Sequence, residues 1–160
     1  MKSKLLHEAE GQRTFALVFE TGEDVVPALR DFAARHGLHA SHLTAIGAFS
    51  EAVLGYFDWQ TKAYMRIPVG EQVEVLSLAG NIVPKDGKPE LHAHVVVGKR
   101  DGTAHGGHLL EAHVRPTLEV IVVESPAHLR RTPDERSGLA LIDLGVPDER
   151  HRREEAPPQR

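Results

Sequence analysis

Three histidines with the spacing of a metal site lie within residues 91–110, LHAHVVVGKRDGTAHGGHLL. His92 and His94 are two residues apart, so on a β-strand their side chains point to the same face, roughly 6–7 Å apart along the chain. Imidazole is the commonest metal ligand in proteins, and ring nitrogens at this separation can converge on one ion. The chain contains 11 histidines in 160 residues, so the prediction of a metal site rests on the positions of these three and not on the number of histidines.

The third histidine of the set, His108, follows a turn whose length decides which way it points. A three-residue loop, Arg100–Gly102, with glycine in the left-handed last position, places His108 directly opposite His94. A two-residue loop shifts the pairing by one residue and turns His108 to the other face of the hairpin. A bulge near Gly106 and Gly107 would restore the pairing in that case. The site hypothesis therefore depends on the turn.

Three imidazoles with an open fourth position match a catalytic zinc site rather than a closed structural one. Zn²⁺ is therefore the predicted cofactor, although nickel, copper and iron also accept imidazole. The alternative is that His92, His94 and His108 are unrelated surface or hydrogen-bonded residues. The histidine that faces the others across the predicted hairpin favours the metal site.

Three further residues are candidates for roles at this site. Glu74 interrupts the apolar run VEVLSL, and its carboxylate could orient a histidine or act as a catalytic base on a bound water. It could equally lie on the solvent side of an alternating strand. Gly106 and Gly107 would let a ligand or another backbone come close, or they mark only a bulge.

The composition excludes several classes of protein. The chain has no cysteine, which excludes disulfides, thiolate metal sites and thiol nucleophiles. A net charge of −4 and a pI of about 6.2 argue against autonomous, nonspecific DNA binding. The N-terminus lacks the apolar core of a signal peptide, and no apolar run reaches the length of a membrane span. We therefore expect a cytoplasmic protein without membrane contact.

The hydrophobic pattern predicts an α+β domain with a mostly antiparallel sheet. Helical spacing predicts one long helix over Gly22–His36, with Pro27 in its first turn and Gly37 as its stop. Turn signals such as Gly47 and Arg115–Pro116 separate the strands. The strands predicted from period-two alternation are Thr14–Glu20, His42–Ile46, Ala52–Trp59, Gln72–Val83, Leu91–Gly98, Thr103–Leu110, Leu118–Glu124 and Leu139–Leu144.

The chain divides into one domain and two terminal segments. Residues 1–12 are polar and predicted to be flexible, and residues 13–145 form the domain. Residues 146–160, VPDERHRREEAPPQR, are predicted to be a disordered charged tail. Many strands after one helix indicate a sheet with the helix on one face, rather than alternating βαβ units.

Beyond these patterns, the chain resembles the PPC domain, "plants and prokaryotes conserved". The resemblance rests on an ordered series of motifs, FALVFETG, LTAIGAF, EVLSLAG, LHAHVVV and GGHLL, which begin at Phe15, Leu43, Glu74, Leu91 and Gly106. It covers residues 10–145, nearly all of the chain but its two ends. The chain is similar to the prokaryotic type, in which the domain stands alone.

The resemblance implies a compact α+β fold with one long helix, assembled as a homotrimer. It also implies a bound metal at His92, His94 and His108, near a subunit boundary, in a protein of unsettled activity. The plant relatives join the domain to AT-hook motifs in nuclear DNA-binding proteins. This chain lacks the Arg-Gly-Arg-Pro core of an AT-hook, the element that reads the A·T-rich minor groove.

Three functions follow as hypotheses. The leading one is a homotrimeric metal-binding protein whose site binds or hydrolyses a small ligand, with Glu74 as the base on a zinc-bound water. The alternative is a DNA-binding or regulatory protein, in which three copies of a weakly basic edge act together. The third is a trimeric scaffold in which the histidines are structural. A chelator that lowers the melting temperature without any activity being found would favour the scaffold.

Overall fold

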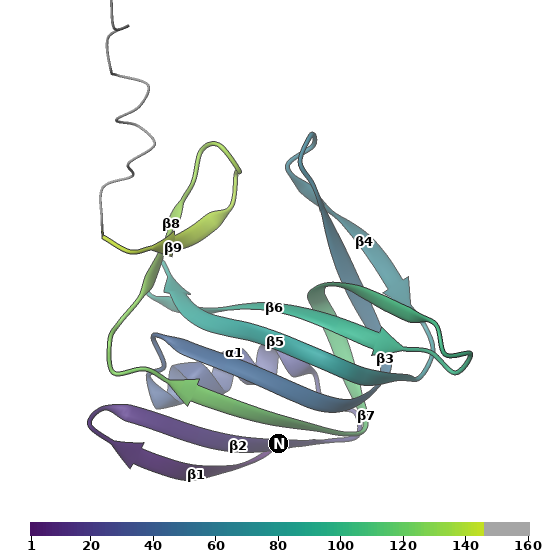
Figure 1. The fold of residues 1–160 in the computed structure, drawn as a ribbon, viewed down its shortest axis with the longest axis horizontal. Coiled ribbons are helices and arrows are strands. Elements are labelled where there is room, and N and C mark those ends of the chain that lie inside the picture. Colours follow the sequence, from purple (N-terminus) through teal and green to yellow (C-terminus); the bar gives the residue numbers. More distant parts are fainter. Residues whose placement is uncertain (146–160) are drawn as a thin grey trace, which may run out of the picture.

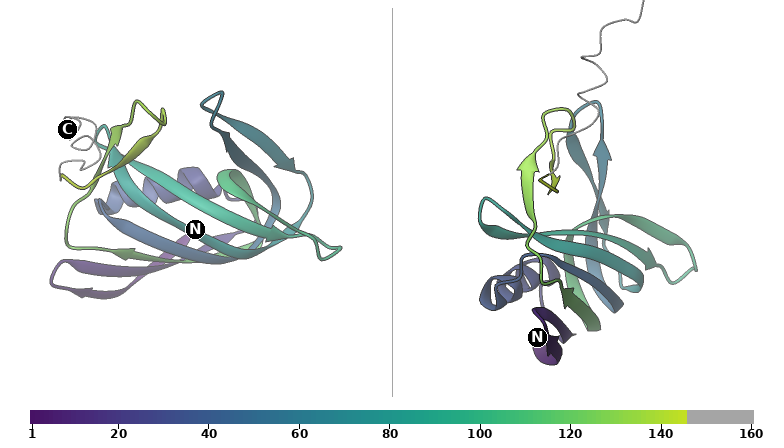
Figure 2. Two further views of the ribbon diagram at one scale, coloured as in Figure 1. Left: turned by 45° about the horizontal axis from the view of Figure 1, so that its top comes forward. Right: turned by 60° about the vertical axis from the view of Figure 1, so that its left-hand side comes forward.

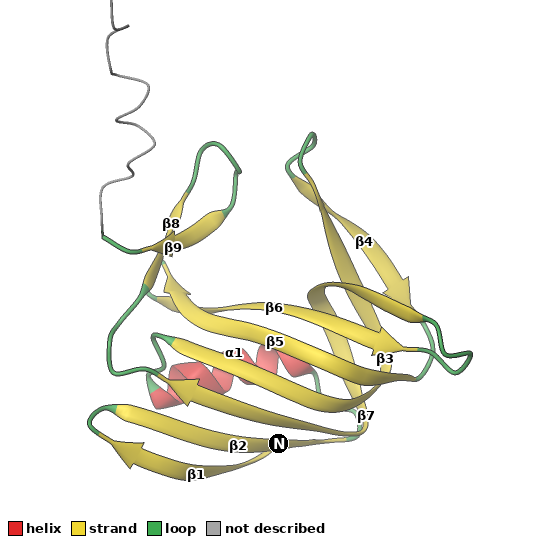
Figure 3. Ribbon diagram, in the orientation of Figure 1, coloured by secondary structure: helices red, strands yellow, loops and turns green. Residues whose placement is uncertain are grey.

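The structure is a computed structural model that describes residues 1–145, and the predicted disordered tail at 146–160 lies outside the described residues. One helix and nine strands make up this part of the chain (Figure 1, Figure 3). The elements are β1 (Lys2–Ala9), β2 (Gln12–Glu20), α1 (Val25–His36), β3 (Ser41–Asp58), β4 (Ala63–Val69), β5 (Val73–Lys85), β6 (Lys88–Gly98), β7 (Ala104–Glu124), β8 (Arg130–Pro133) and β9 (Ala140–Asp143). Within residues 1–145, no helix has the length and apolar character needed to cross a membrane.

Four of the strands pair in a closed ring. β3 pairs with β5 and β7, β5 pairs with β6, and β6 pairs back onto β7. All of these pairings are antiparallel, which confirms the predicted sheet type. β2 and β1 extend the sheet from β7, and β4 extends it from β3. The β8–β9 hairpin joins β5 through one parallel bridge, between Lys85 and Arg131 (Figure 2).

The helix α1 packs against one side of the sheet, behind it in the view of Figure 1. Its buried side chains recur at the predicted helical spacing and are Val25, Leu29, Phe32 and Ala33. The helix begins three residues later than predicted, because Gly22 has a φ of 88° that no helix accommodates. Gly37 ends it in the left-handed conformation, with a φ of 58°. With 12 residues, α1 is shorter than the long helix that was predicted.

Two predicted breaks lie inside continuous strands. The sequence predicts a turn at Gly47, but the pairing of β3 shifts register there and the strand continues. A Cβ at Gly47 would lie 2.3 Å from the carbonyl oxygen of Thr117, so only glycine lets β3 and β7 come this close. The second predicted turn, Arg115–Pro116, is a cis peptide inside β7. As one unbroken strand, β7 pairs with β6 along its first residues and with β2 along its last.

The N-terminal segment is a strand where the sequence predicts flexibility. Within residues 1–12, β1 pairs with β2 around a turn in which Glu10 and Gly11 both have positive φ. Every β1 side chain is exposed, so backbone pairing forms this strand and no hydrophobic pattern marks it. β4 and β8 were also not predicted, because β4 is mostly exposed and β8 has only 4 residues.

Candidate metal centre

The turn between β6 and β7 has the three-residue loop on which the site hypothesis depends. The N–H of Lys99 donates to the carbonyl oxygen of Thr103 at 2.9 Å. Gly102 takes the left-handed conformation, with a φ of 83°. His94 therefore pairs directly with His108, and the loop fixes both side chains on the same face of the hairpin.

Three side chains, His92, His94 and His108, converge on this face and form what we call the histidine triad. Each offers a ring nitrogen, and these nitrogens lie within 4.8 Å of one another. The Nε2 atoms of His92 and His94 are 3.2 Å apart. Two ligands of a tetrahedral zinc ion, each about 2.0–2.1 Å from the metal, are separated by roughly 3.3 Å. The three imidazoles, and the spacing of the His92–His94 pair, therefore fit a zinc ion.

The environment of His92 and His108 lowers the pKa of both rings and so favours neutral imidazole, which is the form that binds metal. Burial, reinforced by His92 and His94, lowers the pKa of His108 from 6.5 to about 4. Burial also lowers the pKa of His92, and the Arg131 guanidinium and His94 add to the effect. Both rings are therefore neutral near pH 7, and a metal ion does not have to displace an imidazolium proton from them.

Tyr64 on β4 supports His108 from the side. The two ring centroids are 4.7 Å apart, and the Tyr64 hydroxyl oxygen lies 3.5 Å from Nδ1 of His108. When Nδ1–H donates to this oxygen, Nε2 is the nitrogen left to bind a metal. Tyr64 was not a predicted site residue, because the pairings of β4 on β3 and of β3 on β7, which bring it to His108, have no signature in the hydrophobic pattern.

A cavity of about 240 Å³ lies beside the histidine triad. It is bounded by β6, β4 and the β8–β9 hairpin, and the last two stand on the same side of the sheet (Figure 2). Its polar lining residues are Tyr64, Lys85, Glu90, His92, His108 and Arg131. The NH2 group of Arg131 lies 3.5 Å from Nδ1 of His92. Arg131 was not a predicted site residue, because the short strand β8 that carries it was not predicted.

Glu74, the predicted catalytic base, lies away from this cluster. It pairs with Gly98 at one end of the β5–β6 ladder, whereas His94 pairs with Ala79 further along the same ladder. From Glu74 to Ala79 the strand advances by roughly 16 Å. The Glu74 side chain is exposed and lines a separate groove with Lys99. Within this chain, the Glu74 carboxylate therefore does not reach a water bound at the histidine triad.

The two glycines of the hairpin differ in their surroundings. A Cβ at Gly107 would lie 2.8 Å from the carbonyl oxygen of Gly55 on β3. A Cβ at Gly106 would lie 3.4 Å from the carbonyl oxygen of Val95, close to ordinary van der Waals contact. Gly107 thus lies close to the backbone of β3, and this close packing lets β7, the strand that carries His108, lie against β3.

Gly107→Ala is expected to lower the free energy of unfolding by roughly 1–3 kcal/mol, because the new methyl group forces β3 and β7 apart. Gly106→Ala is the matched control and is expected to change it by less than about 1 kcal/mol. Urea unfolding followed by circular dichroism measures both changes. Equal effects of the two substitutions would contradict the close backbone approach at Gly107.

Most of the chain corresponds to a known protein family. The family model of the Plants and Prokaryotes Conserved (PCC) domain matches residues 6–126. The chain belongs to this family, which the sequence motifs indicated under its other abbreviation, PPC. No curated protein matches the chain.

Several solved structures are similar to this chain over most of its length. A metal-containing protein from Archaeoglobus fulgidus is 42% identical with a TM-score of 0.76, covering 88% of this chain and 98% of that one. A plant- and prokaryote-conserved (PPC) protein from Pyrococcus horikoshii is 31% identical with a TM-score of 0.77, covering 89% and 94%. A "putative DNA binding protein" from Bacteroides thetaiotaomicron is 28% identical with a TM-score of 0.80, covering 90% and 99%.

Proposed function

We propose that this chain is a cytoplasmic, homotrimeric metal-binding protein that holds Zn²⁺ at the histidine triad and binds or hydrolyses a small ligand beside it. The observation that carries the proposal is the convergence of three ring nitrogens, within 4.8 Å of one another, next to a cavity of about 240 Å³. The similarity to a metal-containing protein at 42% identity supports the presence of an ion.

Bound zinc would supply a Lewis acid and lower the pKa of a coordinated water towards neutrality. The residues of the chain set the conditions for that chemistry. His92 and His108 are held neutral by burial, and Tyr64 orients the His108 ring through Nδ1. Arg131 adds positive charge to the cavity beside them. Glu74 is too far from the triad of its own subunit to take a proton there, so it has no role in this proposal.

Elemental analysis of the protein, purified without added metal, tests the metal site. We expect about one transition-metal ion per chain, since the three histidines form one cluster within residues 1–145. Stripping the protein with a chelator and titrating it with zinc, nickel, copper and iron then identifies the preferred ion. A protein that is isolated without metal and takes up none in these titrations would contradict the proposal.

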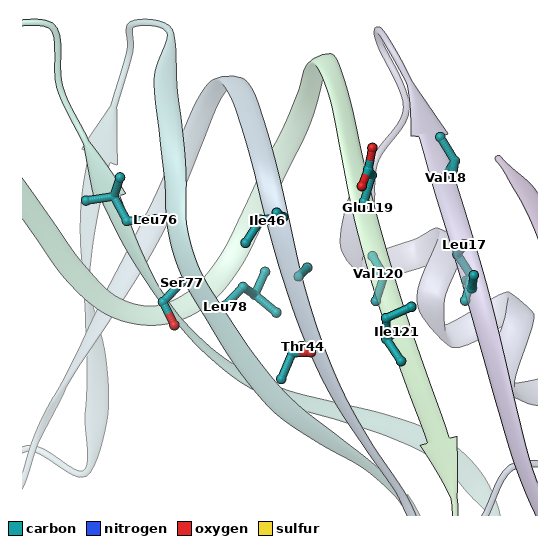
Figure 4. A pocket seen from close by; sticks show the side chains of 12 residues that line it. Leu17, Val18, Thr44, Ile46, Leu76, Ser77, Leu78, Glu119, Val120 and Ile121 are labelled. Atoms are coloured by element: carbon teal, nitrogen blue, oxygen red, sulfur yellow. The ribbon is translucent and has the colours of Figure 1, made fainter.

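An exposed apolar face on the sheet supports a homotrimer. Figure 4 shows side chains of β2, β7, β3 and β5 lining one hollow on this face. Four large apolar side chains of this hollow are 41–60% exposed, and they are Val18, Ile46, Leu76 and Ile121. The hollow has a volume of about 420 Å³. Contiguous exposed apolar surface of this kind marks a protein interface.

The apolar face is continuous with the histidine triad. Val96, which is 41% exposed, pairs with Ser77 in the lining of the hollow. His94 is two residues away on the same strand and on the same exposed side of it. A subunit that covers the hollow would therefore approach His94, as expected for a metal near a subunit boundary.

The alternative function is DNA binding, which is supported by the similarity to the "putative DNA binding protein" from Bacteroides thetaiotaomicron. The chain itself has a net charge of −4, and its broad exposed sheet face carries apolar rather than basic side chains. Fluorescence anisotropy with a labelled duplex is expected to show no binding at micromolar protein between 50 and 200 mM salt. Tight binding at low salt that falls steeply as salt rises would favour the DNA-binding alternative instead.

A further inference from the structure

The guanidinium of Arg131 is buried beside the histidine triad without an ion-pair partner among residues 1–145. Arg131 is only 8% exposed, and it lines the cavity. Its NH1 group donates to the carbonyl oxygen of Ala140 at 2.9 Å, and NH2 donates to Oδ1 of Asn81 at 2.6 Å. Both acceptors are neutral, and Nε has no hydrogen-bond partner among residues 1–145.

The charged groups of the cavity leave this cation without an ion pair. The negative charge of Glu90 acts to raise the pKa of Arg131, against the lowering by burial, but the Glu90 carboxylate forms its ion pair with Arg30, at 2.8 Å. Lys85 adds a second positive charge to the lining. Within residues 1–145, no carboxylate forms an ion pair with Arg131. A buried cation whose hydrogen bonds all go to neutral acceptors is costly, and an anion from outside the chain would supply the missing ion pair.

We propose that the cavity binds a small organic acid, whose carboxylate pairs with Arg131 and whose remaining oxygen atoms face the histidine triad. The inference rests on the proposed metal site and names the class of ligand that this site takes. The planar fork of a guanidinium matches the two oxygens of a carboxylate. Because NH2 of Arg131 is 3.5 Å from Nδ1 of His92, an acid bound at Arg131 lies next to a metal ligand.

The rest of the lining favours an organic acid over inorganic phosphate. The apolar side chains that bound the cavity are Leu91, Leu139, Ala140 and Leu141. They give a carbon skeleton an apolar wall, which inorganic phosphate cannot use. A volume of about 240 Å³ admits a molecule of a few carbon atoms.

Calorimetric titration of malonate into the zinc-loaded full chain tests the inference. Arg131→Met is expected to weaken malonate binding by about tenfold or more, the effect of losing a charge-assisted pair. Arg130→Met is the matched control, because the Arg130 side chain is 72% exposed and pairs with Asp143 instead. It is expected to leave malonate binding unchanged. Phosphate that binds more tightly than malonate would overturn the assignment to an organic acid.

Asn81→Asp provides a second test that does not remove Arg131. The substitution keeps an acceptor beside NH2 of Arg131 but makes it a carboxylate, so the guanidinium gains a counter-ion inside the chain. We expect malonate binding to fall by about tenfold while the melting temperature stays the same or rises. Unchanged malonate affinity in folded Asn81→Asp protein would overturn the inference, whether or not Arg131→Met folds.

The zinc content of each sample separates the two proposals. A chain that takes up no zinc contradicts the proposed function. In that case the Arg131 site is tested separately, by titrating malonate into the metal-free wild-type and Asn81→Asp proteins. A chain that holds zinc, but binds malonate equally well with and without the Arg131 charge, contradicts only the organic-acid site.

Discussion

Replacing His94 with alanine is expected to lower the affinity of the chain for Zn²⁺ by about 100-fold or more. A zinc site with four protein ligands contributes about 10–16 kcal/mol at neutral pH, so each ligand accounts for about 3 kcal/mol. His94 is exposed and pairs with His108 across the hairpin, so alanine removes a ligand without leaving a hole in the core. Competition with a chromogenic chelator measures the change in affinity.

His105→Ala is the matched control, because His105 is an exposed residue of the same hairpin that lies outside the triad. Its zinc affinity is expected to equal that of the wild type. With zinc at 100 times its Kd, the wild-type melting temperature should exceed that of the stripped protein by roughly 5–10 °C. In His94→Ala protein this difference should nearly vanish. Equal zinc affinity in the wild type, His94→Ala and His105→Ala proteins would contradict zinc binding by the histidine triad.

Ile46→Glu is expected to convert the proposed trimer into monomers. Ile46 is 60% exposed in the single chain and lies in the apolar hollow of the sheet, so a trimer that covers this face buries it. A carboxylate buried there without a partner costs several kcal/mol, and the cost recurs in every subunit. Sedimentation velocity over a range of protein concentrations measures the oligomeric state.

Tyr56→Glu is the control for this experiment. Tyr56 lies on the same strand, β3, and is also 60% exposed, but it does not line the hollow. The control is expected to remain trimeric, with the folding of both variants checked by circular dichroism. A wild type that sediments as a monomer would remove the trimer from the proposed function. A trimeric Ile46→Glu protein would show that subunits associate through another surface.

The parts of the fold that bury apolar side chains were predictable, and the parts formed by backbone pairing were not. The spacing of Leu29 and Phe32 predicts α1, because side chains that are buried on one face of a helix recur three to four residues apart. β1 has no buried side chain, so nothing in its sequence distinguishes a strand from a flexible segment. Gly47 predicts a turn on local grounds, but its long-range contact with Thr117 decides that β3 continues.

The histidine triad could be predicted because one hairpin carries all of it. Strand alternation relates His92 to His94, and a short turn relates His94 to His108, so local geometry is sufficient. Tyr64 reaches the same place because β4 forms a hairpin with β3, and β3 pairs with the distant strand β7 at His108. Arg131 reaches it because β8 bridges to the distant strand β5. Glu74 was a plausible base by residue type, but the ladder register that sets its distance from the triad cannot be derived from its own segment.

The closed ring of strands bears on which ions the triad can accept. β6 carries His92 and His94; both residues are paired with β5, and His94 is also paired with His108 on β7. Moving the backbone of His94 away from that of His108 requires this ladder to open locally. The sheet therefore fixes the backbone positions of the triad, and the geometry offered to an ion can change only through rotation of the three side chains. Selectivity among ions would then depend on how well these rotations meet the geometry that each ion prefers.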